Sequence, residues 1–342
     1  MSDDLISLNL GENHLRFAKA KNEGGRINIE VLSQQLGTPT FYESETKKVS
    51  DETIATIRKN VDLLKLRKKR VNIIIPDGFA YSQIIYMPKL KEKELLSAIR
   101  YQADQFIPMP IDETSLDLEI LNESKTENKS LVLIIAAPQK LIERIESLSE
   151  QVGLYPESIE NELSATGRFL ENFYSPLSKT ESTIFINVGY SYTSFYYFDH
   201  AMKLIIDSHS FPAGLAVFLR EAQVDVNIDL AKAKDLLKKV GFTEGTSVDL
   251  NQILQPAVDA LTVELQKFIV SLKTKYPTAA ISRIYVFNLA NEINHLDKKI
   301  AKNVSIPTVT YDPASIIKRT PAVEPYIKEL PSFIAPLGGC LR

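Results

Sequence analysis

One local pattern occurs twice in this chain and restricts the folds open to it. Near the N-terminus an apolar run contains Asn9 and enters a turn at Gly11, and a run near the middle contains Asn187 and turns at Gly189. Extended patterns return after both turns, so each copy predicts a β-hairpin. The repetition predicts two comparable lobes, with a chance likeness between two ordinary α/β units as the alternative.

The elements that follow each hairpin are also similar in kind. In the first half we expect a helix that begins at about Ser50, capped by Ser50 or Asp51, because its apolar residues fall on one face. The chain thus predicts an α/β fold with a first lobe over 1–178 and a second lobe over 179–342. The further expected elements are strands at 27–32, 71–76, 203–207 and 283–287 and helices at 215–222, 230–240 and 256–275.

The first lobe contains an insertion at about 77–150 with its own organisation. A helical stripe predicts a helix over about 92–106, which Pro108 and Pro110 end. We expect strands at 81–88, 116–121 and 130–137, a second helix at 139–152, and an exposed polar loop at 122–129. The insertion is therefore predicted to be a compact α+β subdomain.

Charge and cysteine usage exclude several classes of function. The formal net charge is -3 and the pI about 5.9, so no overall positive field attracts nucleic acid. The single cysteine, Cys340, and four scattered histidines lack the spacing of metal ligands, so we expect no metal site. A signal peptide and a run of roughly 20 apolar residues are both missing, which predicts a cytoplasmic protein.

A string in the insertion resembles a known family. Tyr86-Met87-Pro88, Glu94-Leu95 in the expected helix, and the continuous run from Ile99 to Pro110 resemble the PilM family of type IV pilus assembly proteins. Further similar segments lie at 133–137, 153–156, 231–236 and 337–342. The resemblance implies an actin-like, Hsp70-type ATPase fold similar to that of FtsA, with ribonuclease H-like duplicated lobes around a cleft and the α+β insertion on the first lobe.

In that superfamily each lobe offers a phosphate loop whose backbone N–H groups hold phosphate and whose aspartate holds hydrated Mg²⁺. Here Asn9 and Asn187 stand at both aspartate positions, although Gly11 and Gly189 remain. Asparagine keeps a carbonyl acceptor but lacks the anion, so the attraction for a cation is weakened and a base is lost.

Other loop positions also depart from the family. Glu12 replaces a small hydroxyl residue, Arg16 replaces a lysine, and Leu215 replaces a second glycine after Gly214. The usual glycine run of the adenosine loop begins at Asn288 and continues as Leu289-Ala290, whose Cβ atoms obstruct a nucleoside. The sequence thus predicts a pseudo-ATPase with no catalytic residues and no need for ATP or Mg²⁺. The degenerate nucleotide site comprises Asn9, Gly11, Glu12, Asn13, Arg16, Asn187, Gly189, Tyr190, Gly214 and Asn288.

Aromatic residues alternate along the second hairpin. Such a pattern is typical of a strand with a core face and a covered face. The alternative is that these side chains fill the cleft left by the nucleotide. The residues are Tyr190, Tyr192, Phe195, Tyr196, Tyr197 and Phe198.

The resemblance implies a scaffold at the inner membrane. PilM-like proteins hold a short, extended N-terminal tail of a PilN-like membrane protein in a groove between the first lobe and the insertion. We expect the neighbourhood of the helix end to be exposed and assign this contact to Tyr101, Gln105, Ile107, Pro108 and Met109. Pilus motor ATPases, the platform protein and self-association are further implied partners. The alternatives are a nucleotide-regulated ATPase, a filament-forming protein, and the cytoplasmic part of a type II secretion platform.

Overall fold

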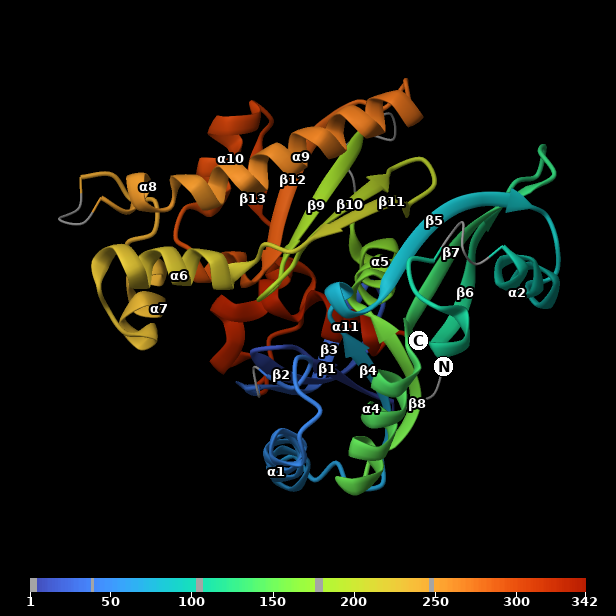
Figure 1. Cartoon of the computed structure of the whole chain (residues 1–342), viewed down its shortest axis with the longest axis horizontal. Helices are drawn as coiled ribbons and strands as arrows, with labels where there is room; N and C mark the ends of the chain where they lie inside the picture. Colours follow the sequence, from blue (N-terminus) through green and yellow to red (C-terminus); the bar gives the residue numbers. More distant parts are fainter. Residues whose placement is uncertain (1–4, 38–39, 103–106, 176–180, 246–248) are drawn as a thin grey trace.

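A computed structural model describes residues 5–37, 40–102, 107–175, 181–245 and 249–342. Two five-stranded sheets lie one above the other, and a three-stranded sheet projects to one side (Figure 1). The first sheet has the order β3-β2-β1-β4-β8. Its strands are β1 (Ile6–Leu10), β2 (His14–Glu23), β3 (Arg26–Leu36), β4 (Arg70–Ile75) and β8 (Tyr155–Asn161).

The second sheet repeats this topology. Its order is β11-β10-β9-β12-β13. In each sheet the first three strands of the order pair antiparallel, and the last two strands are added in parallel. The duplicated lobes predicted from the two hairpins are therefore confirmed, and chance likeness does not explain them. The strands are β9 (Ser182–Val188), β10 (Thr193–Asp199), β11 (Leu204–Phe211), β12 (Ile281–Asn288) and β13 (Thr308–Thr310).

Helices cover the outer faces of both sheets. On the first sheet, α1 (Lys47–Leu63) and α4 (Gln139–Gln151) bury their apolar stripes against β1 and β4. On the second, α9 (Gln255–Lys275) lies along the outer side (Figure 1). Each fully buried Leu or Ile in these layers contributes about 2 kcal/mol through burial of apolar surface. The remaining helices of the second half are α6 (Leu215–Val226), α7 (Leu230–Lys239), α8 (Leu250–Ile253) and α10 (Leu296–Val304), with 3₁₀ turns η3 (Leu289–Glu292), η4 (Pro313–Ile316) and η5 (Glu324–Phe333).

The insertion forms a sheet of order β5-β7-β6 with its own small core. The 3₁₀ turn η1 (Asp77–Phe79) leads into it from the first sheet. Its helix α2 ends at Tyr101, whereas the sequence predicted a helix to 106, and residues 103–106 lie outside the described part. The elements are β5 (Tyr81–Pro88), α2 (Glu92–Tyr101), η2 (Ile111–Glu113), β6 (Thr114–Glu123) and β7 (Lys129–Pro138).

The predicted cap of the first long helix is wrong. Helix α1 begins at Lys47, about one turn before the predicted start, and its N-cap is Thr46, which makes no side-chain capping bond. Ser50 and Asp51 lie inside the helix instead. The apolar stripe identified the helix correctly, but it does not determine which of the preceding polar residues is the N-cap.

Helices α5 (Glu162–Phe173) and α11 (Ile334–Gly339) lie between the two sheets (Figure 1). Although α11 comes from the end of the chain, it packs against α5 and β1 of the first lobe. The approach is close, because a Cβ built on Gly338 would lie 2.8 Å from the backbone carbonyl carbon of Ala165 on α5. Glycine at this position therefore permits backbone packing that a side chain would prevent.

Candidate functional site

The two hairpin turns meet at the cleft between the lobes and have the same geometry. Gly11 donates its N–H to the His14 carbonyl at 3.0 Å, and Gly189 donates to the Tyr192 carbonyl at 2.9 Å. At either glycine a Cβ would lie 2.7 Å from the oxygen that accepts this bond. Both turns therefore require glycine.

Asn9 and Asn187 are joined through one carboxylate. Asn187 donates its Nδ2 to Glu162 Oε2 at 2.7 Å, and Asn9 Nδ2 lies 3.3 Å from Glu162 Oε1. All three side chains are buried. Since Asn9 and Glu162 belong to the first lobe and Asn187 to the second, the carboxylate links the lobes across the cleft.

A second link runs through Arg16 and Asn288. Arg16 is buried; its Nη1 donates to Asn288 Oδ1 at 2.9 Å, and its Nε donates to Gln34 at 2.7 Å. Asn288 Nδ2 donates in turn to Asn187 Oδ1 at 2.8 Å. Asn288 has φ +62° and ψ -122°, a conformation that favours glycine and costs an ordinary residue about 1–3 kcal/mol. The Ser332 hydroxyl also donates to the Asn288 carbonyl at 2.9 Å. Together these hydrogen bonds hold Asn288 in its strained conformation.

A third link joins Tyr196 of β10 to Asp77 of η1. The Tyr196 hydroxyl donates to Asp77 Oδ2, and Asn187 Nδ2 lies 3.0 Å from the same hydroxyl. The other oxygen of Asp77 accepts the N–H of Leu163 at 2.9 Å, at the start of α5. Buried polar groups of this kind are costly unless they are paired, so the three links stabilise the observed arrangement of the lobes.

The N-terminus of α6 is already occupied by the chain itself. Leu215 and Ala216 donate their N–H groups to the carbonyls of Gly189 and Tyr190 at 3.0 and 2.9 Å. Gly214 permits this approach, since a Cβ there would lie 2.6 Å from the Gly189 oxygen. Helix N-termini bind phosphate through free N–H groups, and these two are not free.

The structure brings nearly all residues of the sequence-predicted nucleotide site together. The cavity that remains between them measures about 30 Å³, a volume that accommodates water but not a nucleotide. Gly214 lies behind the turn rather than on the cavity wall. The other predicted residues of the nucleotide site all line the cavity: Asn9, Gly11, Glu12, Asn13, Arg16, Asn187, Gly189, Tyr190 and Asn288.

The aromatic hairpin combines both predicted roles. Phe195, Tyr197 and Phe198 are core residues of the second lobe. Tyr190 and Tyr192 line the cleft, and the hydroxyl of buried Tyr196 reaches Asp77. Most of the set is therefore core, while the residues at the turn and one hydroxyl contribute to filling the cleft.

Sequence reasoning missed Glu162 and Asp77. Both lie at the carboxyl ends of parallel strands, where Asn9, Asn187 and Asn288 also lie. In open α/β sheets these ends collect the functional side chains. A signal was available for Asp77, which follows the buried strand β4 within two positions, whereas β8 before Glu162 is only partly buried.

Burial determines the protonation of the linking carboxylates. It raises the pKa of Glu162 from 4.5 to about 7, and the charge of Asp77 adds to this, while the Asn187 amide and Arg16 oppose it. Burial likewise raises the pKa of Asp77, although the bond from Tyr196 opposes the shift. For Arg16, burial lowers the pKa to about 10 against the charge of Glu162. Near neutral pH the network therefore holds less negative charge than its residue types suggest.

We predict that Glu162 makes stability depend on pH. Between pH 4.5 and about 7 the folded protein retains a proton that the unfolded chain has lost, so stability is full below pH 4.5 and falls as pH rises through 7. Glu162→Gln should remove about 2–3 kcal/mol of this decline between pH 5 and 8, measured by urea unfolding at each pH. Glu146→Gln, on the exposed face of α4, is the control and should follow the wild type. Parallel pH profiles for wild type and Glu162→Gln would refute the assignment.

A groove of about 500 Å³ lies between the first lobe and the insertion. Its walls are largely aromatic and aliphatic, with charged residues among them. It is lined by Tyr42, Glu45, Asp77, Gly78, Phe79, Ala80, Tyr81, Met109, Glu113, Pro138, Lys140, Leu141, Arg144, Tyr192 and Ser210. We call this surface the groove.

The sequence-predicted partner residues divide among three places. Met109 lines the groove. Ile107, predicted to be exposed, is instead buried in the core of the insertion, because it packs with the apolar face of α2. Tyr101 is 91% exposed at the end of α2, and neither it nor exposed Pro108 is part of the groove lining. Gln105 lies outside the described residues.

No helix in the described ranges has both the length and the apolar character needed to cross a bilayer. That observation adds no site, and the cleft and the groove remain the two candidate sites.

Comparison with known proteins identifies the family. The model of the type IV pilus assembly protein PilM matches residues 7–341. The chain resembles a solved structure described as the PilM-PilN type IV pilus biogenesis complex, with TM-score 0.83, 18% identity, and 99% of this chain and 98% of that chain covered. It also resembles a Bacteroides thetaiotaomicron protein with an actin-like ATPase fold (TM-score 0.51, 12% identity, 91% of each chain covered). A third likeness is to MreB 5 of Spiroplasma citri bound to AMPPNP (TM-score 0.54, 12% identity, 99% and 95% covered).

These likenesses confirm the actin-like fold predicted from the sequence. Since the family model covers nearly the whole chain, the protein belongs to the PilM family of type IV pilus assembly proteins.

Proposed function

We propose that this protein is a scaffold of the inner-membrane assembly complex of a type IV pilus, and that the groove binds a short N-terminal cytoplasmic tail of a PilN-like protein. The observation that carries the proposal is the groove itself, about 500 Å³ between the first lobe and the insertion. The likeness to the solved PilM-PilN complex supports the choice of a PilN-like protein as the partner. In this account the protein lies in the cytoplasm and is held at the membrane by that tail.

The groove has the chemistry that an extended peptide needs. Phe79 stacks on Tyr42 with ring centroids 4.1 Å apart, and Tyr81, Met109 and Leu141 add apolar surface nearby. Extended peptides are recognised by apolar pockets for alternate side chains together with main-chain hydrogen bonds. An aromatic lining suits aliphatic and proline side chains, which bury surface there at little entropic cost.

We propose further that the protein is a pseudo-ATPase. Three observations support this: the Mg²⁺-binding aspartates are replaced by Asn9 and Asn187, the remaining cavity is about 30 Å³, and the N-terminal N–H groups of α6 are bonded within the chain. Asn288 adds a side chain where the family has glycine. These residues do not fit Mg-nucleotide, so no catalytic step is assigned to them.

Calorimetric titration of the purified protein with a synthetic peptide of the partner's cytoplasmic N-terminus tests the groove. We expect saturable binding to the wild type and a loss of at least about 30-fold for Met109→Asp, because a carboxylate must then be desolvated on binding. Val270→Asp, which changes an exposed apolar residue on α9, is the control and should bind normally. Equal affinity for Met109→Asp and wild type, or no binding by the wild type, would exclude the groove as the tail site.

A further inference from the structure

The groove has one wall that comes from the second lobe. The ring of Tyr192, in the turn between β9 and β10, lies directly against Gly78: a Cβ built on Gly78 would lie 2.6 Å from Tyr192 Cε2 and closer to two other ring atoms. The Tyr192 ring also packs edge-to-face against Phe79, with the two ring centroids 5.8 Å apart. With the Phe79–Tyr42 stack, a continuous aromatic row crosses from the second lobe to the first.

The turn that carries Tyr192 is fixed at both ends. Ser191 donates its N–H to Glu12 Oε1 of the first lobe at 3.1 Å. Behind it, the carbonyls of Gly189 and Tyr190 accept the first N–H groups of α6. The position of Tyr192 over the groove therefore follows the position of the second lobe relative to the first.

The buried polar network fixes that position. Tyr196 of the second lobe bonds Asp77, the residue directly before Gly78, so the bond holds η1 in place. Asn187 bonds Glu162 at 2.7 Å a short distance away. Asp77 lines both the cleft and the groove, which makes η1 the element that the two sites share.

We propose that the tail-binding surface spans both lobes, with Tyr192 as its second-lobe wall, and that Tyr196 is a positioning residue for this wall. The occupant is an extended peptide that places an aliphatic or proline side chain against Tyr192 and Phe79. This inference rests on the proposed function of the groove. It goes beyond that proposal in assigning part of the binding affinity to the second lobe, which contributes Tyr192 to the groove.

Three variants test the proposal with the tail peptide as the probe. Tyr192→Ala should weaken binding about 10-fold or more, because it removes an aromatic contact. Tyr196→Phe should weaken binding at least about five-fold, although its hydroxyl is buried and cannot touch the peptide. The control is Tyr197→Phe, which removes a hydroxyl from the next residue of the same strand; that hydroxyl bonds only Ser182 of the same lobe among described residues, at 2.9 Å. Its affinity should stay within two-fold of wild type.

Normal binding by Tyr192→Ala would overturn the composite surface, and normal binding by Tyr196→Phe would overturn the positioning role. After either result, the groove remains the tail-binding site if Met109→Asp still shows its large loss of affinity. Hydrogen exchange of the free protein decides the positioning role without the peptide. The amides of Phe79, Ala80 and Ser191 should exchange at least about five-fold faster in Tyr196→Phe than in Tyr197→Phe, and equal rates would contradict it.

Discussion

Replacing Gly338 by alanine is expected to destabilise the protein by more than about 4 kcal/mol. A Cβ there would lie 2.8 Å from the Ala165 carbonyl carbon, closer still to its oxygen, and 3.1 Å from Phe169 Cβ. Overpacking usually costs about 1–3 kcal/mol because side chains yield, but here the obstacle is the backbone of α5. The helices α5 and α11 would have to separate, which would expose the centre of the molecule.

A matched glycine on α5 should give the opposite sign. A Cβ at Gly167 meets only Ile205 Cδ1, at 3.6 Å, which is ordinary contact. Gly167→Ala should therefore stabilise the protein by about 1 kcal/mol through the helix propensity of alanine. Urea unfolding followed by circular dichroism measures both variants. A cost below about 1 kcal/mol for Gly338→Ala would mean that α11 does not dock on α5 as described.

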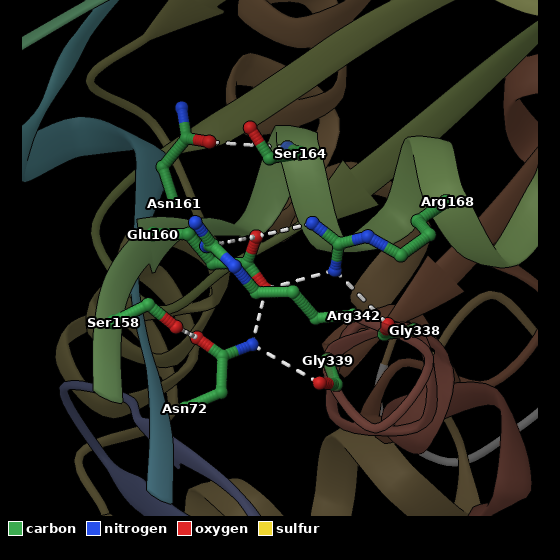
Figure 2. A network of polar contacts seen from close by, with 9 residues as sticks. All are labelled: Asn72, Ser158, Glu160, Asn161, Ser164, Arg168, Gly338, Gly339 and Arg342. Carbon is green, nitrogen blue, oxygen red and sulfur yellow. Dashed lines mark hydrogen bonds and ion pairs between the residues drawn. The ribbon is translucent and has the colours of Figure 1, made fainter. Parts of the chain in front are cut away.

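Arg168→Ala is expected to cost about 3–5 kcal/mol. Arg168 forms two bonds with the carboxylate of Glu160, at 3.0 and 2.6 Å, and the Glu160 side chain is only 4% exposed. Figure 2 shows the two side chains facing each other beside the C-terminal segment. Removing Arg168 leaves the buried carboxylate with only the longer ion pair to Arg342, at 3.7 Å, among described residues, and a poorly compensated buried charge is the costly case.

The same network attaches the end of the chain to the first lobe. Arg168 Nη1 donates to the Gly338 carbonyl and Asn72 Nδ2 to the Gly339 carbonyl, both at 3.1 Å, and Arg342 lies 3.7 Å from Glu160 (Figure 2). We therefore expect Arg168→Ala to lose protection of the C-terminal segment as well as stability.

An exposed pair provides the control for Arg168. Arg67 bonds Asp62 on the surface, with 65% and 43% of the side chains exposed, so Arg67→Ala should leave the free energy of unfolding close to that of the wild type. Chemical unfolding measures both variants. Similar small costs for Arg67→Ala and Arg168→Ala would show that the Glu160 pair is not buried as a unit.

The sequence predicted much of the fold because its signals are local and periodic. Two hairpins with the same Asn and Gly positions gave the duplication, and long apolar stripes such as that of α9 gave helices with bounds close to those observed. Helix α5 was not predicted as an element, although Leu163, Phe169 and Leu170 lie on its buried face, because that face also includes polar residues such as Thr166. Docking of α11 on the first lobe depends on contacts between residues over 150 positions apart, which no local pattern contains.

The candidate site was predicted in part for the same reason. Residues in the two turns could be placed together, because turn geometry is local. The partners that cross the cleft, Glu162, Asp77 and the Tyr196 hydroxyl, depend on how the lobes pack. Ile107 illustrates the opposite error: an apolar residue beside prolines was assigned to the surface, whereas tertiary packing buries it.

The central claim is that this PilM-family protein holds its partner by the groove and needs no nucleotide to do so. Calorimetric titration with the tail peptide, in buffer without nucleotide and in buffer with millimolar Mg-ATP, tests it most directly. The account predicts the same affinity within two-fold in both buffers, and no binding heat when Mg-ATP is titrated alone. Micromolar binding of Mg-ATP that is lost on changing Gly11, or a clear shift in tail affinity with nucleotide, would contradict it.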